Sequence, residues 1–310
     1  QQLAMFHRPV KKVVIGDRCH AQLIKSDQKK HFLYDIGREE VGYFTIKLYS
    51  SAWQKITVCY GEHIADGCVR RKIDNRDFSF EMVVDEGYTS YTNYFRRLGL
   101  RYMEIYAENE VMIEYASVLP CSYPLNIIKR SFDNDLMDDI YNVAVRTLQL
   151  CMHDHYEDCP WREQALYTMD SRNQMLCGYY AFGEYDFPRA NLYFMSKDSR
   201  EDGLLSMCTP SSLDLTIPSF SLHYIIEVYE YAYYSGDITL VAEIMPKLCS
   251  VLRVFTERME NGLVPVFIGK SYWNFYEWAK GLDGTQSEEG AIDAALNCLL
   301  SIAFDRMDKL

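Results

Sequence analysis

The sequence predicts a protein of two domains, an antiparallel β-sandwich followed by about six helices joined as hairpins. Two observations predict this arrangement. The first ~120 residues contain short β-branched and aromatic segments separated by turn signals, whereas apolar residues further along recur at helical spacing. The length of 310 residues also fits two ordinary domains better than one. We expect the sandwich over residues 1–125 and the helical domain over residues 126–310.

The segments expected as strands are short, and many alternate apolar with polar residues. This alternation places one face against a core and the other in water. Turn signals such as Ile36-Gly37 and Glu108-Asn109 separate the segments, and no helical pattern lies between them, which favours an antiparallel sandwich. The segments are 31–35, 43–49, 55–60, 78–84, 101–106 and 111–115.

Helical spacing begins after residue 125. Residues from Leu136 to Leu150 form one stripe at steps of four and three. A second helix is expected to follow Pro160, because proline suits the first helical position. A third covers Ala190–Met195. The segment Lys197–Pro218 reads as a long loop, which in a small domain indicates a functional loop.

Capping residues predict where the other helices begin and end. Ser131 is expected to cap the first helix, Ser219 the fourth and Asp237 the fifth, while Gly236 ends the fourth. Ser287 is expected to open the sixth helix. The residues expected to face inward on the fourth and fifth helices are Leu222, Ile225, Ile226, Tyr229, Leu240, Val241, Ile244 and Leu248.

The composition excludes several classes of partner and cofactor. The net charge of -12 argues against binding to nucleic acid or to an anionic membrane. No apolar run approaches the ~20 residues that a membrane span needs. The sequence starts at Gln1 without a signal-peptide pattern, which decides nothing about a leader. The ten cysteines lack C-x-x-C spacing, so we expect buried thiols and no structural zinc. His153 and His155 are the only close histidine pair, and we expect no metal and no cofactor. The 25 tyrosines fit sugar stacking, or simply a tyrosine-rich core, which we favour.

The segment Asp158–Asp170 carries the residues best suited to acid chemistry. If a helix begins near Pro160, Glu163 and Asp170 share one of its faces, and Asp158 lies just before the first turn. Glycoside hydrolysis uses such a set, with one carboxylic acid to protonate the leaving oxygen and others to hold hydroxyls. A helix start would lower the pKa of an acid, so apolar neighbours would have to raise it. On spacing alone we favour a plainer alternative, in which Asp158 is an N-cap and Glu163 pairs with an arginine.

A second candidate is the segment Tyr272–Trp278, where Trp273, Glu277 and Trp278 could form a platform for a sugar. Core packing explains these residues equally well. Other chemistries are less well supported, because no glycine-rich phosphate loop follows a strand and no G-x-S-x-G elbow occurs. Cys159 has no histidine placed by sequence to activate it.

The segment Asp158-Cys-Pro-Trp-Arg-Glu163 with Asp170 resembles the Asp-Cys-Pro-x-Arg-Glu…Asp signature of glycoside hydrolase family 78, the bacterial α-L-rhamnosidases. Other segments resemble the family as well, so that the resemblance covers roughly residues 30–305. These segments are Tyr34–Arg38, Tyr60–Glu62, Leu98–Tyr102, Ile217–Phe220, Tyr234–Asp237 and Trp273–Trp278.

The resemblance implies a β-sandwich followed by an (α/α)6 barrel, and hydrolysis of α-L-rhamnosides with inversion. It points to a bacterial protein, whose compartment, cytoplasm or periplasm, stays unknown. By position, Glu163 would be the general acid, and Asp158, Arg162 and Asp170 would bind the rhamnose hydroxyls. The tryptophans Trp273 and Trp278 would lie near the apolar face of the sugar.

The chain departs from the family pattern in two ways. Gln164 stands where many members have a second acidic residue, and Leu166–Met169 replaces a Gly-Trp-Thr-Gly-like run, which leaves the substrate open. The barrel of the family has twelve helices, and the family's general base is a Glu on a later helix. We therefore expect an incomplete barrel that is inactive by itself, with its base beyond Leu310.

Two alternatives remain open at this point. One is a six-hairpin glycosidase for another sugar, and the other is a carbohydrate-binding protein without catalysis. A half barrel would expose apolar helix faces, and a homodimer is one way to cover them.

Overall fold

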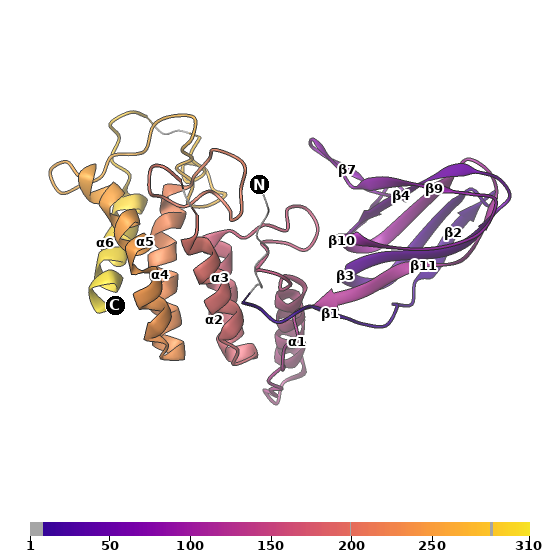
Figure 1. The fold of residues 1–310 in the computed structure, drawn as a ribbon, viewed down its shortest axis with the longest axis horizontal. Coiled ribbons are helices and arrows are strands. Elements are labelled where there is room, and N and C mark those ends of the chain that lie inside the picture. Colours follow the sequence, from indigo (N-terminus) through magenta and orange to yellow (C-terminus); the bar gives the residue numbers. More distant parts are fainter. Residues whose placement is uncertain (1–8, 199, 286–287) are drawn as a thin grey trace, which may run out of the picture.

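The computed structural model describes residues 9–198, 200–285 and 288–310 as a sheet domain and a helical domain that lie side by side (Figure 1). The predicted sandwich followed by helices is confirmed. The strands are β1 (Val14–Ile15), β2 (Gln22–Asp27), β3 (His31–Ser50), β4 (Gln54–Gly61), β5 (Ile64–Ala65), β6 (Cys68–Val69), β7 (Lys72–Ile73), β8 (Arg76–Asp77), β9 (Ser79–Val84), β10 (Gly87–Ala107) and β11 (Val111–Ser122).

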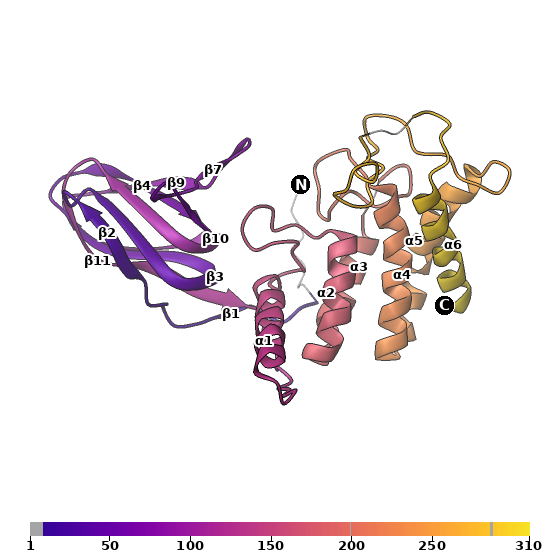
Figure 2. The ribbon, with the colours of Figure 1, turned by 180° about the vertical axis from the view of Figure 1, so that it is seen from behind.

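Seven strands form one antiparallel sheet in the order β1-β11-β3-β10-β4-β9, with β2 added beside β3. The long strands β3 and β10 pair along most of their length, and register shifts in β10 interrupt this pairing. Side chains without exposed surface, such as Phe44, Ile46 and Val58, fill the core. The hairpins β5–β6 and β7–β8 extend from this sheet. Figure 2 shows that β7 lies at the end of the sheet domain nearest the helices.

All six expected strand segments lie within strands, although the segment at 78–84 begins one residue later, at Ser79. The expected turn at Ile36-Gly37 is wrong, because the chain continues through it as β3. Gly37 takes a positive φ of 87°, which glycine adopts without steric cost, and its N–H donates to Asp35 Oδ1 at 2.7 Å. The signal therefore marks a bend inside one strand.

The helices pack as two layers, as expected for helical hairpins. They are α1 (Asp135–Leu150), α2 (Thr168–Ala181), α3 (Asp186–Ser196), α4 (Pro218–Ser235), α5 (Ile238–Glu257) and α6 (Ala294–Lys309). In one layer α4 lies between α2 and α6, while α3 packs against α5 in the other. The inward residues expected on α4 and α5 are buried, except that Tyr229 is only partly so.

Of the four capping predictions that fall on described residues, two were right and two were wrong. Gly236 ends α4 in the left-handed conformation with a φ of 74°, and Asp237 caps α5 by accepting a hydrogen bond from the Thr239 N–H. Asn134, rather than Ser131, caps α1. Ser219 lies inside the first turn of α4, where its hydroxyl donates to the Phe275 carbonyl at 2.6 Å.

The expected start of the sixth helix is also wrong. Helix α6 begins at Ala294 and follows Asp293 as its N-cap residue. Ser287, which we expected to open this helix, lies outside the described residues. The apolar stripe expected on α1 does form one face of a helix. That face is exposed, with 68% of Leu136 and 67% of Val143 accessible to solvent. The expected homodimer stays a prediction.

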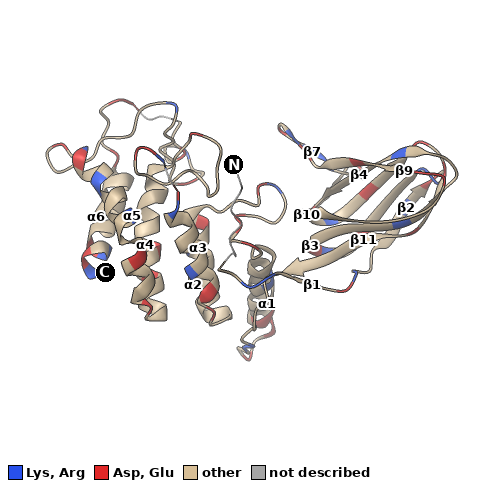
Figure 3. Ribbon diagram, viewed as in Figure 1, with Lys and Arg blue, Asp and Glu red and all other residues tan. Residues whose placement is uncertain are grey.

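Two contacts fix the loop after α1 against the sheet domain. Trp161 packs into the core of the sheet domain with its ring 4.6 Å from that of Phe78. The buried Glu157 forms an ion pair with Arg97 of β10. The segment that carries the candidate catalytic residues therefore rests on the sheet. Figure 3 shows acidic and basic residues interspersed over both domains.

Candidate active site

The Asp158–Asp170 segment is mainly a closed loop, not the helix that Pro160 predicted. Helix α2 begins only at Thr168. Two hydrogen bonds between Asp158 and Ala165 close the loop. The Asp158 N–H donates to the Ala165 carbonyl oxygen at 3.0 Å, and the Ala165 N–H donates to Asp158 Oδ1 at 2.9 Å. Gln164 takes a φ of 54°, which a continuing right-handed helix does not allow. Asp158 is thus a loop-closing residue and not a helix cap.

A cavity of about 720 Å³ lies between this loop, the N-terminal ends of α2 and α4, and the segment around Trp273. The six residues to which the family resemblance gave a role line this cavity, whereas Glu277 does not. They are Asp158, Arg162, Glu163, Asp170, Trp273 and Trp278. The predicted meeting of these residues is therefore observed, although the local structure that brings them together differs from the helix we expected.

Glu163 is held by two partners in the cavity. Arg76 of β8 donates from Nη2 to Glu163 Oε1 at 2.8 Å, and Tyr167 donates its hydroxyl to Glu163 Oε2 at 2.8 Å. Burial and the neighbouring carboxylate raise the pKa of Tyr167, so its hydroxyl stays a donor at neutral pH. The pairing of Glu163 with an arginine, which we set out as the plainer alternative, is thus present. It coexists with the position of Glu163 on the cavity wall.

The two aspartates of the cavity are harder to ionise than usual. Burial, together with the smaller effect of the Asp158 and Glu163 carboxylates, raises the pKa of Asp170 to about 6. Burial also raises the pKa of Asp158, against hydrogen bonds that lower it. Asp170 lies in the first turn of α2, where the positive helix end opposes this effect. A cavity that withdraws several carboxyl groups from water is suited to acid chemistry.

Aromatic side chains form the opposite wall. The Trp273 and Trp278 rings lie 5.6 Å apart in an edge-to-face arrangement, and Phe275 packs against both. Trp273 is fixed by donating its indole N–H to the Asp283 carbonyl at 2.8 Å. Trp278 leaves 76% of its surface exposed, so much of its ring is open to contact with a ligand in the cavity.

Other carboxylates of the helical domain do not line this cavity. Glu227 is fully buried and accepts from the Ser171 hydroxyl at 2.7 Å, while Glu230 forms a two-point ion pair with Arg172. Glu277 accepts a hydrogen bond from the N–H of the next residue. We assign none of these three as a catalytic base.

The described part of the chain bears on metal sites, thiols and membrane spans as follows. Its residues contain no cluster of three His, Cys, Asp or Glu side chains arranged to hold a metal. Both rings of the His153/His155 pair contact oxygen atoms of the protein. Burial raises the pKa of Cys159 to about 11, so this thiol stays protonated at neutral pH. Among the described helices, none has the length and apolar character needed to cross a bilayer.

Sequence reasoning missed several residues of the cavity wall. Arg76 lies on a two-residue strand without any motif, so nothing in the sequence signalled that it reaches Glu163. Met207 comes from the long loop that we expected to be functional. Phe220 lies one residue after Ser219, at the start of α4, and Phe275 lies within the aromatic segment we had singled out. Attention to loop length could have found Met207, attention to helix N-termini could have found Phe220, and the aromatic segment itself contains Phe275.

Paired helices in two layers, with an acidic cavity walled by tryptophans at the N-terminal ends of α2 and α4, fit the class of six-hairpin glycosidases. The chain belongs to the bacterial α-L-rhamnosidase family. Residues 130–310 match the bacterial alpha-L-rhamnosidase 6 hairpin glycosidase domain, and residues 25–119 match the concanavalin-like domain of the same family. No curated protein matches the chain.

Three solved structures show the same fold. A family 78 rhamnosidase of Bacillus sp. GL1 is 24% identical, with a TM-score of 0.81 over 92% of this chain and 30% of its own. A Klebsiella oxytoca rhamnosidase with rhamnose bound is 19% identical, with a TM-score of 0.77 over 96% of this chain and 65% of its own. A Streptomyces avermitilis α-L-rhamnosidase complexed with L-rhamnose is 15% identical, with a TM-score of 0.71 over 84% of this chain and 26% of its own. The chain thus spans about a third of the length of the Bacillus enzyme.

Proposed function

We propose that the complete protein is an α-L-rhamnosidase that removes terminal α-L-rhamnose from glycosides or polysaccharides with inversion. The observation that carries this proposal is the meeting of Asp158, Arg162, Glu163 and Asp170 in one cavity opposite two tryptophans. Two solved relatives of the same fold contain rhamnose, which supports this sugar as the ligand.

In this mechanism Glu163 is the general acid that protonates the leaving oxygen. Its side chain is 26% exposed on the cavity wall, where the carboxyl group can reach a bound glycosidic oxygen. Arg76 and Tyr167 fix its orientation. Asp158, Asp170 and Arg162 accept from or donate to the sugar hydroxyls, and the tryptophans cover its apolar face.

Inversion also needs a base that activates water, with the two carboxyl groups roughly 6.5–9.5 Å apart. The aspartates of the cavity are proposed to hold hydroxyls, and Glu227, Glu230 and Glu277 do not line it. We therefore assign no base in this chain, and we propose that the 310 residues alone do not turn over. Turnover of rhamnosides by this chain alone would contradict that assignment.

A screen of nitrophenyl glycosides with the complete protein tests the function. We expect release of nitrophenol from the α-L-rhamnoside and from none of the other sugars. Release from a different glycoside alone would identify a six-hairpin glycosidase for that sugar. Binding of rhamnose without any product would identify a carbohydrate-binding protein.

The role of Asp170 predicts a pH dependence. Its pKa of about 6 means that the carboxyl is ionised above this pH and protonated below it. If the ionised form accepts from sugar hydroxyls, rhamnose affinity falls by about tenfold as the pH drops from 7 to 5, since a charge-assisted hydrogen bond is lost. The Asp170→Asn variant binds more weakly and loses this pH step, as titration with rhamnose at several pH values would reveal. The exposed Asp308→Asn serves as the matched control, and an unchanged pH step in Asp170→Asn would refute the assignment.

Arg76 is proposed as a positioning residue for Glu163. The Arg76→Gln variant keeps a shorter polar side chain but loses the charged contact at 2.8 Å. We expect kcat for a nitrophenyl rhamnoside to fall by about tenfold with little change in KM, because a misplaced acid slows the chemical step. Arg76→Lys should recover part of the rate. Arg70→Gln, which removes an exposed arginine outside the cavity, should behave like wild type. A change in KM alone would argue against positioning.

A further inference from the structure

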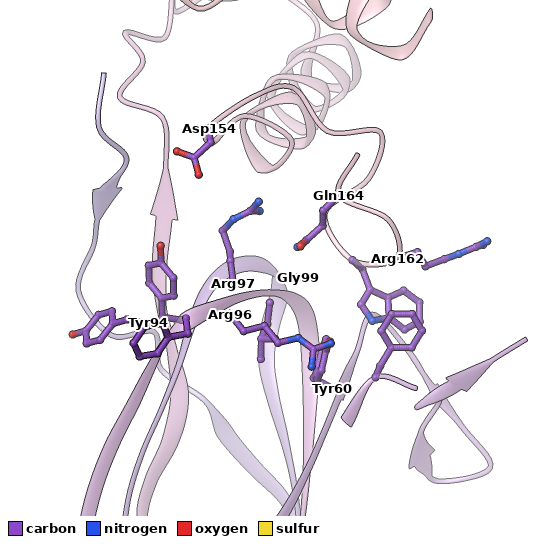
Figure 4. A pocket seen from close by; sticks show the side chains of 13 residues that line it. Tyr60, Tyr94, Arg96, Arg97, Gly99, Asp154, Arg162 and Gln164 are labelled. Atoms are coloured by element: carbon purple, nitrogen blue, oxygen red, sulfur yellow. The ribbon is translucent and has the colours of Figure 1, made fainter. Parts of the chain in front are cut away.

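A second cavity, of about 490 Å³, lies between the sheet domain and the loop after α1 (Figure 4). Its walls come from β10 and neighbouring strands on one side, and from Asp154 and the Trp161–Gln164 turn on the other. Arg162 borders both this cavity and the catalytic one, so the two lie on either side of the same turn. In Figure 4 the Arg162 side chain extends away from the other labelled groups.

An irregular stretch of β10 turns aromatic rings outward at this cavity. The pairing of β10 with β3 changes register between Thr92 and Arg97, and Asn93 Oδ1 accepts from the Phe95 N–H within this stretch. Tyr94 is 56% exposed and Phe95 is 101% exposed, so the Phe95 ring contributes nothing to a core. Exposed aromatic rings beside a cavity are suited to stacking on the C–H faces of a ligand.

The polar groups of the cavity have both signs of charge. Arg96 extends over the Tyr60 ring and donates to its hydroxyl at 2.7 Å. The charge of Arg97 is matched by the buried Glu157, to which it donates at 2.9 Å. Figure 4 shows Asp154 and Gln164 on the opposite wall. Mixed donors and acceptors beside aromatic rings fit a neutral ligand rich in hydroxyl groups better than an anion.

We propose that this cavity is a second carbohydrate subsite, which takes a neutral pyranose unit of the glycan that carries the terminal sugar. The inference rests on the proposed function, since it places the glycan's terminal unit in the neighbouring catalytic cavity. Phe95 and Tyr94 supply the stacking face, and Arg96, Asp154 and Gln164 contact the hydroxyls. The protein then prefers glycans that extend beyond the rhamnose over simple aryl rhamnosides.

The Phe95→Ala variant tests this subsite without disturbing the fold, because the ring is wholly exposed. The substrates are 4-nitrophenyl α-L-rhamnoside and a set of neutral trisaccharides with terminal α-L-rhamnose on glucose, galactose or mannose units. For the best trisaccharide we expect kcat/KM of the complete protein to fall by about fivefold in Phe95→Ala, the loss expected for one stacking contact. Activity on the nitrophenyl rhamnoside should stay within about twofold, because that substrate does not reach the second cavity. Tyr88→Ala, which removes an aromatic ring 76% exposed on the same strand, is the control and should change neither rate.

Equal losses on both substrates, or no loss on any trisaccharide, would overturn the subsite. Hydrolysis of the nitrophenyl rhamnoside but of no trisaccharide would overturn it as well. Saturation-transfer NMR with the same trisaccharides provides a readout that does not need turnover. We expect signals from the unit next to rhamnose in wild type and their loss in Phe95→Ala. A protein that shows these signals but hydrolyses no rhamnoside would contradict the proposed function while supporting the subsite, and the absence of the signals in wild type would overturn the subsite.

Discussion

We expect the Glu163→Gln variant of the complete protein to lose hydrolysis of rhamnosides with poor leaving groups by about a thousandfold or more. The amide keeps the size and the contact with Tyr167 but has no proton to give to the leaving oxygen, and a general acid contributes roughly 10²–10⁴ in rate. Rhamnosides with very good leaving groups, such as dinitrophenyl, should lose much less, because their departure needs little protonation. The measurement is kcat/KM across a series of aryl and alkyl rhamnosides with leaving groups of graded pKa.

Two controls keep this result interpretable. Glu277→Gln removes a carboxylate that does not line the cavity and should keep the wild-type rates. The ion pair of Glu163 with Arg76 is partly exposed, so its loss should cost about 1 kcal/mol or less of unfolding free energy. If Glu163→Gln retained wild-type rates on poor leaving groups while folded, the acid assignment would be wrong.

The second large effect is expected at Gly99, where β10 contacts the loop from Asp158 to Ala165. A Cβ atom on this residue would lie 2.0 Å from the Pro160 carbonyl oxygen and 3.0 Å from the Trp161 nitrogen. Both of these are backbone atoms, so the whole turn that leads to Glu163 has to move. We expect Gly99→Ala to lose about 2 kcal/mol of unfolding free energy, in the range of overpacked cores. We also expect at least a tenfold loss of kcat, since small displacements of a catalytic group are costly.

Alanine variants at two other glycines distinguish a general loss of stability from a displacement of the turn that carries Glu163. Gly42→Ala meets a comparable clash, 2.1 Å from the Leu119 carbonyl oxygen, but within the sheet domain. It should therefore destabilise the protein and leave kcat close to wild type. Gly16→Ala has its nearest neighbour at 3.8 Å and should change little. Urea unfolding combined with nitrophenyl rhamnoside kinetics measures all three, and normal kcat in Gly99→Ala would show that the contact with Pro160 does not position the acid.

Periodicity was enough to predict the order and type of the main elements, because burial imposes a two-residue repeat on strands and a longer one on helices. It could not predict that β3 continues through Gly37, since the same signal serves a turn or a bend. Side-chain caps were predicted correctly at Asp237 but not at Ser219, whose hydroxyl donates to the Phe275 carbonyl, a partner 56 positions away in the sequence. Such distant contacts leave no local pattern.

The candidate site was predictable to the extent that one short segment carries it. Asp158, Glu163 and Asp170 lie close in sequence and also line one cavity, so their association did not depend on the wrongly placed helix. Arg76 comes from a hairpin of the other domain, 87 positions away from Glu163, and no repeat or motif links the two. The positive φ of Gln164 is likewise imposed by the closed loop rather than by the residue type.

The anomer released by the complete protein tests the central claim most directly. Proton NMR recorded during the first minutes of 4-nitrophenyl α-L-rhamnoside hydrolysis distinguishes the two anomers before they interconvert. We predict that β-L-rhamnose appears first and α-L-rhamnose only later by mutarotation, and that Glu163→Gln slows this release on substrates with poorer leaving groups. Initial release of α-L-rhamnose, or no release of rhamnose at all, would contradict an inverting α-L-rhamnosidase.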